Sequence, residues 1–166
     1  MWLADANLAA TETFGVSGIN ANGSMTWDTA NIWIGGMNTA NWLGFSDWRL
    51  PTALNLDGTG PEYGYGEVVK GSEMNHLFYD ELGGTAASAI STSGDPDLSL
   101  FANLQDEIYW SGTAANPFDV WGFNFGNGNA GTMPKVFTTY YALAVRSDAS
   151  LLPCPNPQLL PSSESA

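Results

Sequence analysis

The feature that most constrains the fold is an aromatic pattern in the second half of the chain. In "DVWGFNFG" (119–126), Trp121, Phe123 and Phe125 alternate with other residues. Side chains of a β-strand point alternately to opposite faces, so this period predicts a strand with one aromatic face. The segment "GNGNAG" (126–131) follows, and Asn-Gly readily adopts the positive φ of a tight turn. The second half is therefore predicted to consist of strands joined by turns.

Two more segments have the composition of strands. "EIYWSGT" (107–113) and "YYALAVRS" (140–147) are rich in aromatic and β-branched residues and are bounded by residues typical of turns. We predict a strand in each. "WLADANLA" (2–9) is a candidate for a further short strand.

The first half has helical patterns. "TWDTANIWIGGMNTANWLG" (26–44) is predicted to be a helix that begins after Ser24 or Thr26 and stops at Gly44. Gly35 and Gly36 in its middle indicate close packing rather than helix propensity. The apolar face has helical spacing and is formed by Trp27, Ala30, Ile34 and Met37.

A second helix is predicted in "GSEMNHLFYDELGG" (71–84). Ser72 is placed to cap its N-terminus, an apolar stripe follows, and Gly83 and Gly84 end it. Helices first and strands later predict an α+β fold rather than alternating βαβ units.

Two long connections, 53–70 and 85–106, carry little regular pattern. Connections of this length in a compact domain are usually functional or disordered. We expect any ligand site to lie in these two loops or in 126–138. The Pro- and Ser-rich residues 148–166 have the composition of a disordered tail, which leaves one domain over residues 1–147.

The charge balance excludes several partners. Four Lys and Arg residues against 17 Asp and Glu residues give a formal net charge of −13, which repels nucleic acids, anionic membranes and sulfated polysaccharides. No apolar run approaches the ~20 residues of a membrane span, so we expect no membrane insertion. The start of the sequence shows no signal peptide, and the single cysteine, Cys154, allows no intrachain disulfide.

The acidic residues raise the question of a cation site. The stretch "NLDGTGPEYGYGE" (55–67) holds Asp57, Glu62 and Glu67 in one loop. Calcium binds several carboxylate and carbonyl oxygens at once, so it is the candidate cofactor. The spacing matches no EF-hand loop, and the alternative is that these acids are solvated and keep the chain soluble.

Catalytic patterns are weak. His76 is the only histidine, and its position inside the second predicted helix favours a structural or solvated role over membership of a Ser-His-Asp triad. Asp106 and Glu107 are neighbours, which point to opposite faces of a strand and so do not supply the facing carboxylates of a glycosidase. We expect no enzymatic activity; a hydrolase is the third alternative.

Aromatic and amide side chains are the candidates for carbohydrate binding. Tyr63 and Tyr65, flanked by glycines in a long loop, are the candidates for exposed contacts. Trp110 and Trp121 could stack on a sugar, but positions in the core explain them better. The amide candidates are Asn124, Asn127 and Asn129.

Several motifs occur in a fixed order: "MTWDTANIWIGGMN", "LGFSDWRLPT", "GSEMNHLFYDELGG", "YWSGT", "VWGFNFGNG" and "YALAVR". Together they resemble the Lcl C-terminal domain family, a domain of unknown function, over nearly all of the predicted domain. The resemblance implies a C-type-lectin-like fold: two helices on a small twisted antiparallel sheet, paired chain ends, and long loops that carry any ligand site. Similar chains are bacterial secreted proteins with a Pro-Glu-Pro sorting tail, which this sequence lacks. The resemblance thus implies a secreted or cell-surface location.

The resemblance also bears on Arg49, a scarce cation in "SDWRLPT" (46–52). It implies that Trp48 faces the core and that Arg49 is a structural clamp on Asp47, Glu73 or loop carbonyls. A planar guanidinium suits this role because it can donate to several acceptors at once. The alternative is an arginine that binds a ligand.

These observations predict a non-enzymatic extracellular domain for ligand binding or adhesion, with a glycan or a surface or matrix polymer as partner. The rival from another class is a structural protein that self-associates into a surface layer, filament or matrix. Low charge density and many Asn and Gly residues would suit that rival.

Overall fold

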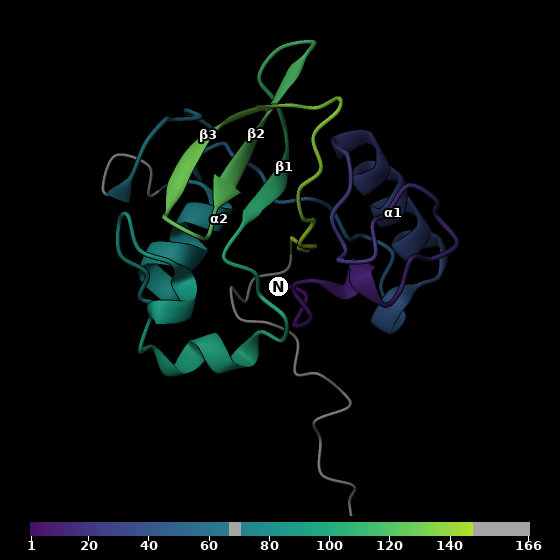
Figure 1. Cartoon of the computed structure of the whole chain (residues 1–166), viewed down its shortest axis with the longest axis horizontal. Helices are drawn as coiled ribbons and strands as arrows, with labels where there is room; N and C mark the ends of the chain where they lie inside the picture. The colour runs from purple at the N-terminus through teal and green to yellow at the C-terminus, as the bar shows by residue number, and fades with distance from the viewer. Residues whose placement is uncertain (67–70, 148–166) are drawn as a thin grey trace, which may run out of the picture.

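A three-stranded antiparallel sheet lies at the centre of the computed structural model, which describes residues 1–66 and 71–147 (Figure 1). Strands β1 (Ile108–Ala114), β2 (Asp119–Asn124) and β3 (Asn129–Pro134) follow one another in the order β1-β2-β3. The first two are the strands predicted at 107–113 and 119–126. With the helices described below, this sheet makes the α+β fold that the sequence predicts.

Strand β3 corrects one expectation, because it occupies much of the segment 126–138 that we expected to be a loop. The register pairs Asn124 with Asn129, so the Asn-Gly turn closes a tight hairpin and the chain returns along β2 at once. The returning strand contains Ala, Gly and Thr in place of aromatic residues, which is why its pattern is weak.

The predicted strand at 140–147 is wrong in form. This segment makes single antiparallel bridges from Tyr140 to Met25 and from Val145 to both Trp2 and Arg49. Each bridge joins a single pair of residues, so segment 140–147 forms no continuous β-ladder with any one partner. The segment at 2–9 is likewise no strand: it makes single bridges at Trp2 and Asp5, and Leu8–Ala10 forms a short 3-10 helix, η1.

Helix α1 (Trp27–Thr39) lies on the β1 side of the sheet (Figure 1). Thr26 caps it, since its side chain accepts a hydrogen bond from the Thr29 amide. The helix ends before the predicted Gly44, because Asn41 adopts a left-handed conformation with φ of 51° and a 3-10 turn, η2 (Trp42–Gly44), follows. Close packing holds at Gly36, where a Cβ would lie 2.9 Å from the Cβ of Phe14, but not at Gly35, where a Cβ would meet nothing within 4 Å.

The second helix is less regular than predicted. Helix α2 (Glu73–His76) continues directly into a π-helical turn, η4 (Leu77–Glu81), and Ser72 at its N-cap position makes no side-chain cap bond. The wider turn places Phe78 edge-on against Phe123 of β2, with ring centroids 5.3 Å apart. The following connection, 85–106, contains two 3-10 turns, η5 (Ile90–Thr92) and η6 (Pro96–Leu100).

The core is built around tryptophans whose polar edges are satisfied. Trp33 and Trp110 are fully buried, and Trp48 and Trp121 are also buried. Trp27, which the sequence places on the apolar face of the first helix, is only partly buried. A buried indole N–H needs an acceptor, and in four cases the acceptor is a backbone carbonyl. The pairs are Trp27 with Ser111, Trp33 with Glu12, Trp48 with Trp42, and Trp110 with Met25.

Two glycines that face each other across β2 and β3 give a matched test of this packing. Gly122 pairs with Gly131. A Cβ on Gly122 would lie 2.8 Å from the Tyr109 carbonyl oxygen, whereas one on Gly131 meets only the Asn129 side chain at 3.6 Å. We expect Gly122→Ala to lower the free energy of unfolding by about 1–3 kcal/mol and Gly131→Ala to change it by less than ~0.5 kcal/mol. Urea unfolding measures both, and equal effects would contradict this packing.

Candidate functional site

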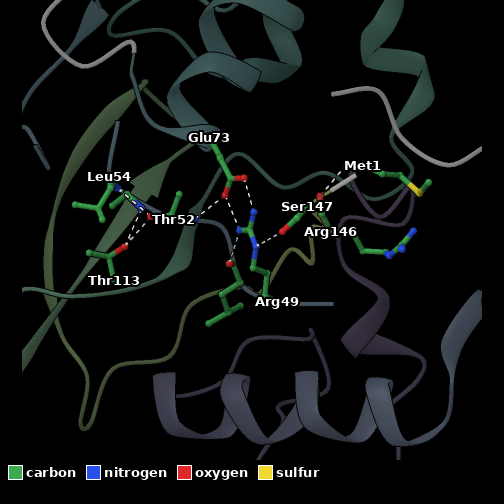
Figure 2. Close-up of polar contacts among 10 residues, drawn as sticks. Met1, Arg49, Thr52, Leu54, Glu73, Thr113, Arg146 and Ser147 are labelled. Carbon is green, nitrogen blue, oxygen red and sulfur yellow. Dashed lines mark hydrogen bonds and ion pairs between the residues drawn. The ribbon is translucent and has the colours of Figure 1, made fainter. Parts of the chain in front are cut away.

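A bidentate ion pair between Arg49 and Glu73 joins the "DWRLPT" segment to the start of α2 (Figure 2). Arg49 Nη1 donates to Glu73 Oε2 and Nη2 donates to Oε1, each at 2.7 Å. The same Oε2 accepts the Thr52 amide at 2.7 Å, and Nη1 also reaches the Leu50 carbonyl at 3.2 Å. The hydrogen bonds that Arg49 donates to Glu73 raise the pKa of its guanidinium above the ordinary value. Arg49 thus contacts one of its two expected carboxylate partners.

Asp47, the other carboxylate expected near Arg49, pairs with Arg146 instead. The Arg146 guanidinium is buried and lies 3.6 Å from the centre of the Phe45 ring. Its hydrogen bond lowers the pKa of the Asp47 carboxyl. Met1 lies beside this pair, since its amino group donates to the Arg146 carbonyl at 3.0 Å (Figure 2).

A pocket of about 360 Å³ opens beside Arg49. Its lining comes from α1, from the "DWRLPT" segment and from β1, and comprises Asn31, Ile34, Arg49, Leu50, Thr52, Gly112 and Thr113. Two threonine hydroxyls, Thr52 Oγ1 and Thr113 Oγ1, lie 3.3 Å apart within this lining. The pocket therefore has an apolar part and several hydrogen-bonding groups.

The two predicted tyrosines lie along strand β3. Gly64, between them, exchanges two backbone hydrogen bonds with Ala130, of 3.0 and 2.9 Å. The Tyr63 ring is 64% exposed, and its centroid lies 4.4 Å from that of Trp121. The Tyr63 hydroxyl is 3.2 Å from Thr132 Oγ1. Tyr63 is thus an exposed aromatic side chain held in place from beneath.

Tyr65 is 44% exposed, and its neighbour Tyr79 connects it to the β2–β3 turn. The Tyr79 hydroxyl donates to the Gly128 carbonyl at 2.6 Å. Burial raises the pKa of Tyr79, and the nearby Tyr65 hydroxyl acts in the same direction. The tyrosine segment and the turn therefore lie side by side.

The three predicted asparagines belong to this turn, and two of them shape it. Asn124 Oδ1 accepts the Gly126 amide at 2.8 Å, and Asn127 Oδ1 accepts the Asn129 amide at 3.0 Å. These side-chain oxygens are used inside the turn. Asn129 is next to Ala130, so it lies beside the Tyr63–Tyr65 segment.

The proposed calcium ligands are not gathered into a cluster in the described part of the chain. Asp57 Oδ1 accepts the Thr59 amide at 2.9 Å and its hydroxyl at 2.6 Å, and these bonds lower the Asp57 pKa. Glu67 lies outside the described residues. Within residues 1–66 and 71–147, no three His, Cys, Asp or Glu side chains could together hold a metal ion. The calcium site stays a prediction, which unfolding with and without Ca²⁺ would test.

His76 faces two carboxylates of its own helix. Its Nδ1 lies 2.8 Å from Asp80 Oδ2 and its Nε2 lies 3.1 Å from Glu81 Oε1. Both ring nitrogens are therefore engaged by acids of the π-helical turn.

No helix in the described part of the chain is both long and apolar enough to span a bilayer.

The fold brings the "DWRLPT" and "YWSGT" motifs together, since the Gly112 amide donates to the Pro51 carbonyl at 2.8 Å. Residues 1–146 match the sequence model of the Lcl C-terminal domain. The chain belongs to this family. A comparison with curated proteins gave no match. In this Lcl C-terminal domain, the two motifs form part of the pocket wall, and Arg49 of the first motif pairs with Glu73 of α2.

Sequence reasoning missed Thr52, Thr113 and Asn31 as pocket residues. Thr52 is the last residue of "DWRLPT" and Thr113 is the last residue of "YWSGT". The signal available in the sequence was that both motifs end in a threonine. Asn31 lies on the first predicted helix but outside its apolar face. At such a position nothing in the sequence separates an asparagine that lines a pocket from an ordinary solvated one.

A double-mutant cycle tests the strength of the Arg49–Glu73 pair. We expect Arg49→Ala to lower the free energy of unfolding by about 2–4 kcal/mol, because it leaves the mostly buried Glu73 carboxylate unpaired. Glu73→Ala should lower it by less, because the Arg49 side chain that it leaves is 37% exposed. The coupling energy should be about 1–3 kcal/mol. The control is the more exposed pair of His76 and Asp80, whose coupling should stay below ~0.5 kcal/mol. Similar coupling in the two pairs would argue against a clamp.

The Asp47–Arg146 pair predicts a pH dependence. The pKa of Asp47 is lowered below 3.8 in the folded state, so the pair stabilises the fold above that pH and is lost as pH falls through the folded-state pKa. Asp47→Asn should therefore be less stable than the wild type at neutral pH. The difference should vanish in acid, as measured by urea unfolding across pH. A difference that did not change with pH would contradict the assignment.

Proposed function

We propose that this chain is a non-enzymatic extracellular binding domain that holds glycans at a surface formed by Tyr63, Trp121 and Thr132, called here the tyrosine platform. The observation that carries the proposal is an exposed aromatic ring with a fixed orientation. The Tyr63 ring is 64% exposed, yet Trp121 supports it from beneath and Thr132 contacts its hydroxyl. A solvent-exposed ring on an otherwise free loop would instead lose rotamer entropy on binding.

The platform suits a sugar for chemical reasons. A flat aromatic face packs against the C–H face of a sugar ring, and neighbouring hydroxyl and amide groups can bond to its hydroxyls. Thr132 supplies such a hydroxyl group beside the Tyr63 ring. Asn129 lies three residues earlier on β3 and shares the opposite face with Gly131. With a formal net charge of −13, the chain favours neutral or basic glycans over sulfated ones. A secreted or surface location, by resemblance, is the setting in which such a partner is met.

A specific observation also favours the rival, a self-associating protein. Phe118, Val136 and Phe137 are 77%, 47% and 98% exposed. The Lys135 amide donates to the Phe118 carbonyl at 3.0 Å, so the two loops lie side by side. Exposed apolar side chains gathered in this way are typical of interaction surfaces. Sedimentation of the wild type and of a Phe118→Ser, Phe137→Ser variant would test this rival: a concentration-dependent oligomer that the variant loses would support it.

The platform is tested by glycan-array screening followed by calorimetry with the best ligand. We expect Tyr63→Ala to raise Kd at least tenfold, which is about 1.4 kcal/mol, because the stacking surface is lost. Tyr63→Phe should bind nearly as well as the wild type, since it keeps the ring.

The matched control is Phe137→Ala, which removes an exposed aromatic side chain that has no ring contact among the described residues. It should leave Kd unchanged. Far-UV circular dichroism would confirm that all three variants fold. Equal loss of binding in Tyr63→Ala and Phe137→Ala, or no glycan bound by the wild type, would overturn the proposal.

A further inference from the structure

We propose that the pocket beside Arg49 is a second binding site, which takes one neutral, hydroxyl-rich unit such as a monosaccharide or a small polyol. This site does not depend on the tyrosine platform, because the two share no lining residue. Its volume of about 360 Å³ lies within the range of small-molecule sites, roughly 300–1,000 Å³.

The pocket combines segments that are distant in the sequence. Asn31 and Ile34 come from α1, Arg49 and Leu50 from the "DWRLPT" segment, and Thr113 from β1. Ile34 and Leu50 are buried and form the apolar part. The Arg49–Glu73 ion pair fixes one wall, so the site is formed before a ligand arrives.

The two threonine hydroxyls leave a donor available. Thr113 Oγ1 accepts the Ala53 amide at 2.9 Å, and Thr52 Oγ1 accepts the Leu54 amide at 3.1 Å. The hydroxyls lie 3.3 Å apart, and only one of their two hydrogens can be shared between them. The other O–H is therefore free to donate to a molecule in the pocket.

Arg49 and Asn31 add one donor and one acceptor. Among the described residues, Arg49 Nη2 has a single bond, to Glu73 Oε1, so one of its two hydrogens remains for a ligand. The Asn31 amide nitrogen donates to the Trp27 carbonyl at 2.9 Å, which leaves Asn31 Oδ1 as an acceptor on the exposed side of α1. A ligand here must both accept and donate hydrogen bonds.

The charge of the site selects a neutral ligand. Glu73 balances the charge of Arg49 by bidentate contact, so an anion would have to compete with a carboxylate that is already well placed. The net charge of −13 also disfavours anions. Hydroxyl groups donate and accept at once, and the C–H face of a sugar or polyol can cover Ile34 and Leu50.

The test is a ¹H–¹⁵N NMR titration of the full chain with glycerol and with methyl glycosides of glucose, mannose and galactose. We expect saturable shifts of the Gly112, Thr113 and Ala53 amides with a millimolar Kd for at least one probe. Inorganic sulfate at equal ionic strength should give no such shifts. Absence of saturable shifts with every probe, or shifts with sulfate alone, would overturn the proposal.

Variants locate the binding. Asn31→Leu should raise Kd at least fivefold, because it replaces the acceptor by an apolar side chain at an exposed helix position. The neighbouring Ile32→Ala, at an exposed position that is not part of the pocket lining, is the matched control and should not change Kd.

Tyr63→Ala should leave the shifts at Gly112 and Thr113 intact, which separates this site from the tyrosine platform. Loss of those shifts in Tyr63→Ala, or an Asn31→Leu variant that binds like the wild type, would overturn the assignment. Failure of glycan binding at the platform leaves this measurement unaffected.

Discussion

The ion pair between Arg49 and Glu73 is the constraint on which the rest of the structure depends. Through its side chain, Arg49 holds the first turn of α2, and through its backbone it exchanges two hydrogen bonds of 2.9 Å with Val145. Val145 in turn bridges Trp2, at the start of the chain. One residue therefore connects a helix, the N-terminal segment and the C-terminal segment. Thr52 extends the same junction toward β1, because its amide donates to Glu73 and its hydroxyl lies 3.3 Å from Thr113 Oγ1.

Such a pair is not an obvious source of net stability. Removing two charges from water costs several kcal/mol, and their attraction often only offsets that cost. The geometry of the pair fixes orientation. Two parallel hydrogen bonds from a planar guanidinium hold the Glu73 carboxylate in one arrangement, and the Thr52 amide donates a third hydrogen bond to it. In a chain whose segments often meet in single bridges rather than long ladders, one directional contact can fix how they are arranged. The pair also neutralises the wall of the pocket, which is why the pocket has polar groups without net charge.

The sequence predicted those parts of the fold whose signal is local. The aromatic alternation of β2 and the apolar face of α1 depend only on neighbouring residues, and both are present in the structure. Strand β3 was missed because Ala130, Gly131 and Thr132 are held by pairing with β2 rather than by their own preference. The prediction for segment 140–147 failed for the opposite reason: its composition suits a strand, but its partners are scattered along the chain.

The sequence could not decide whether Arg49 pairs with Glu73 or with Asp47, because either carboxylate could have been its partner. The structure decides it through Arg146, which packs on Phe45 and takes Asp47 as its own partner.

The loop that begins at Ala53 connects the two proposed sites. Its start is attached to Thr113, which lines the pocket, and Gly64 attaches it to Ala130 beside the tyrosine platform. Both attachments are made to the sheet, so residues 53–64 of the loop extend from β1 to β3 and are held at Ala53 and at Gly64. Fixing the ends of a loop lowers the conformational entropy that a ligand must still remove. A ligand that engages the Thr113 hydroxyl acts on the same oxygen that accepts the Ala53 amide, and so on the attachment of this loop. The connection 53–70, which has no regular pattern in the sequence, is thus the segment that contacts both the pocket beside Arg49 and the tyrosine platform.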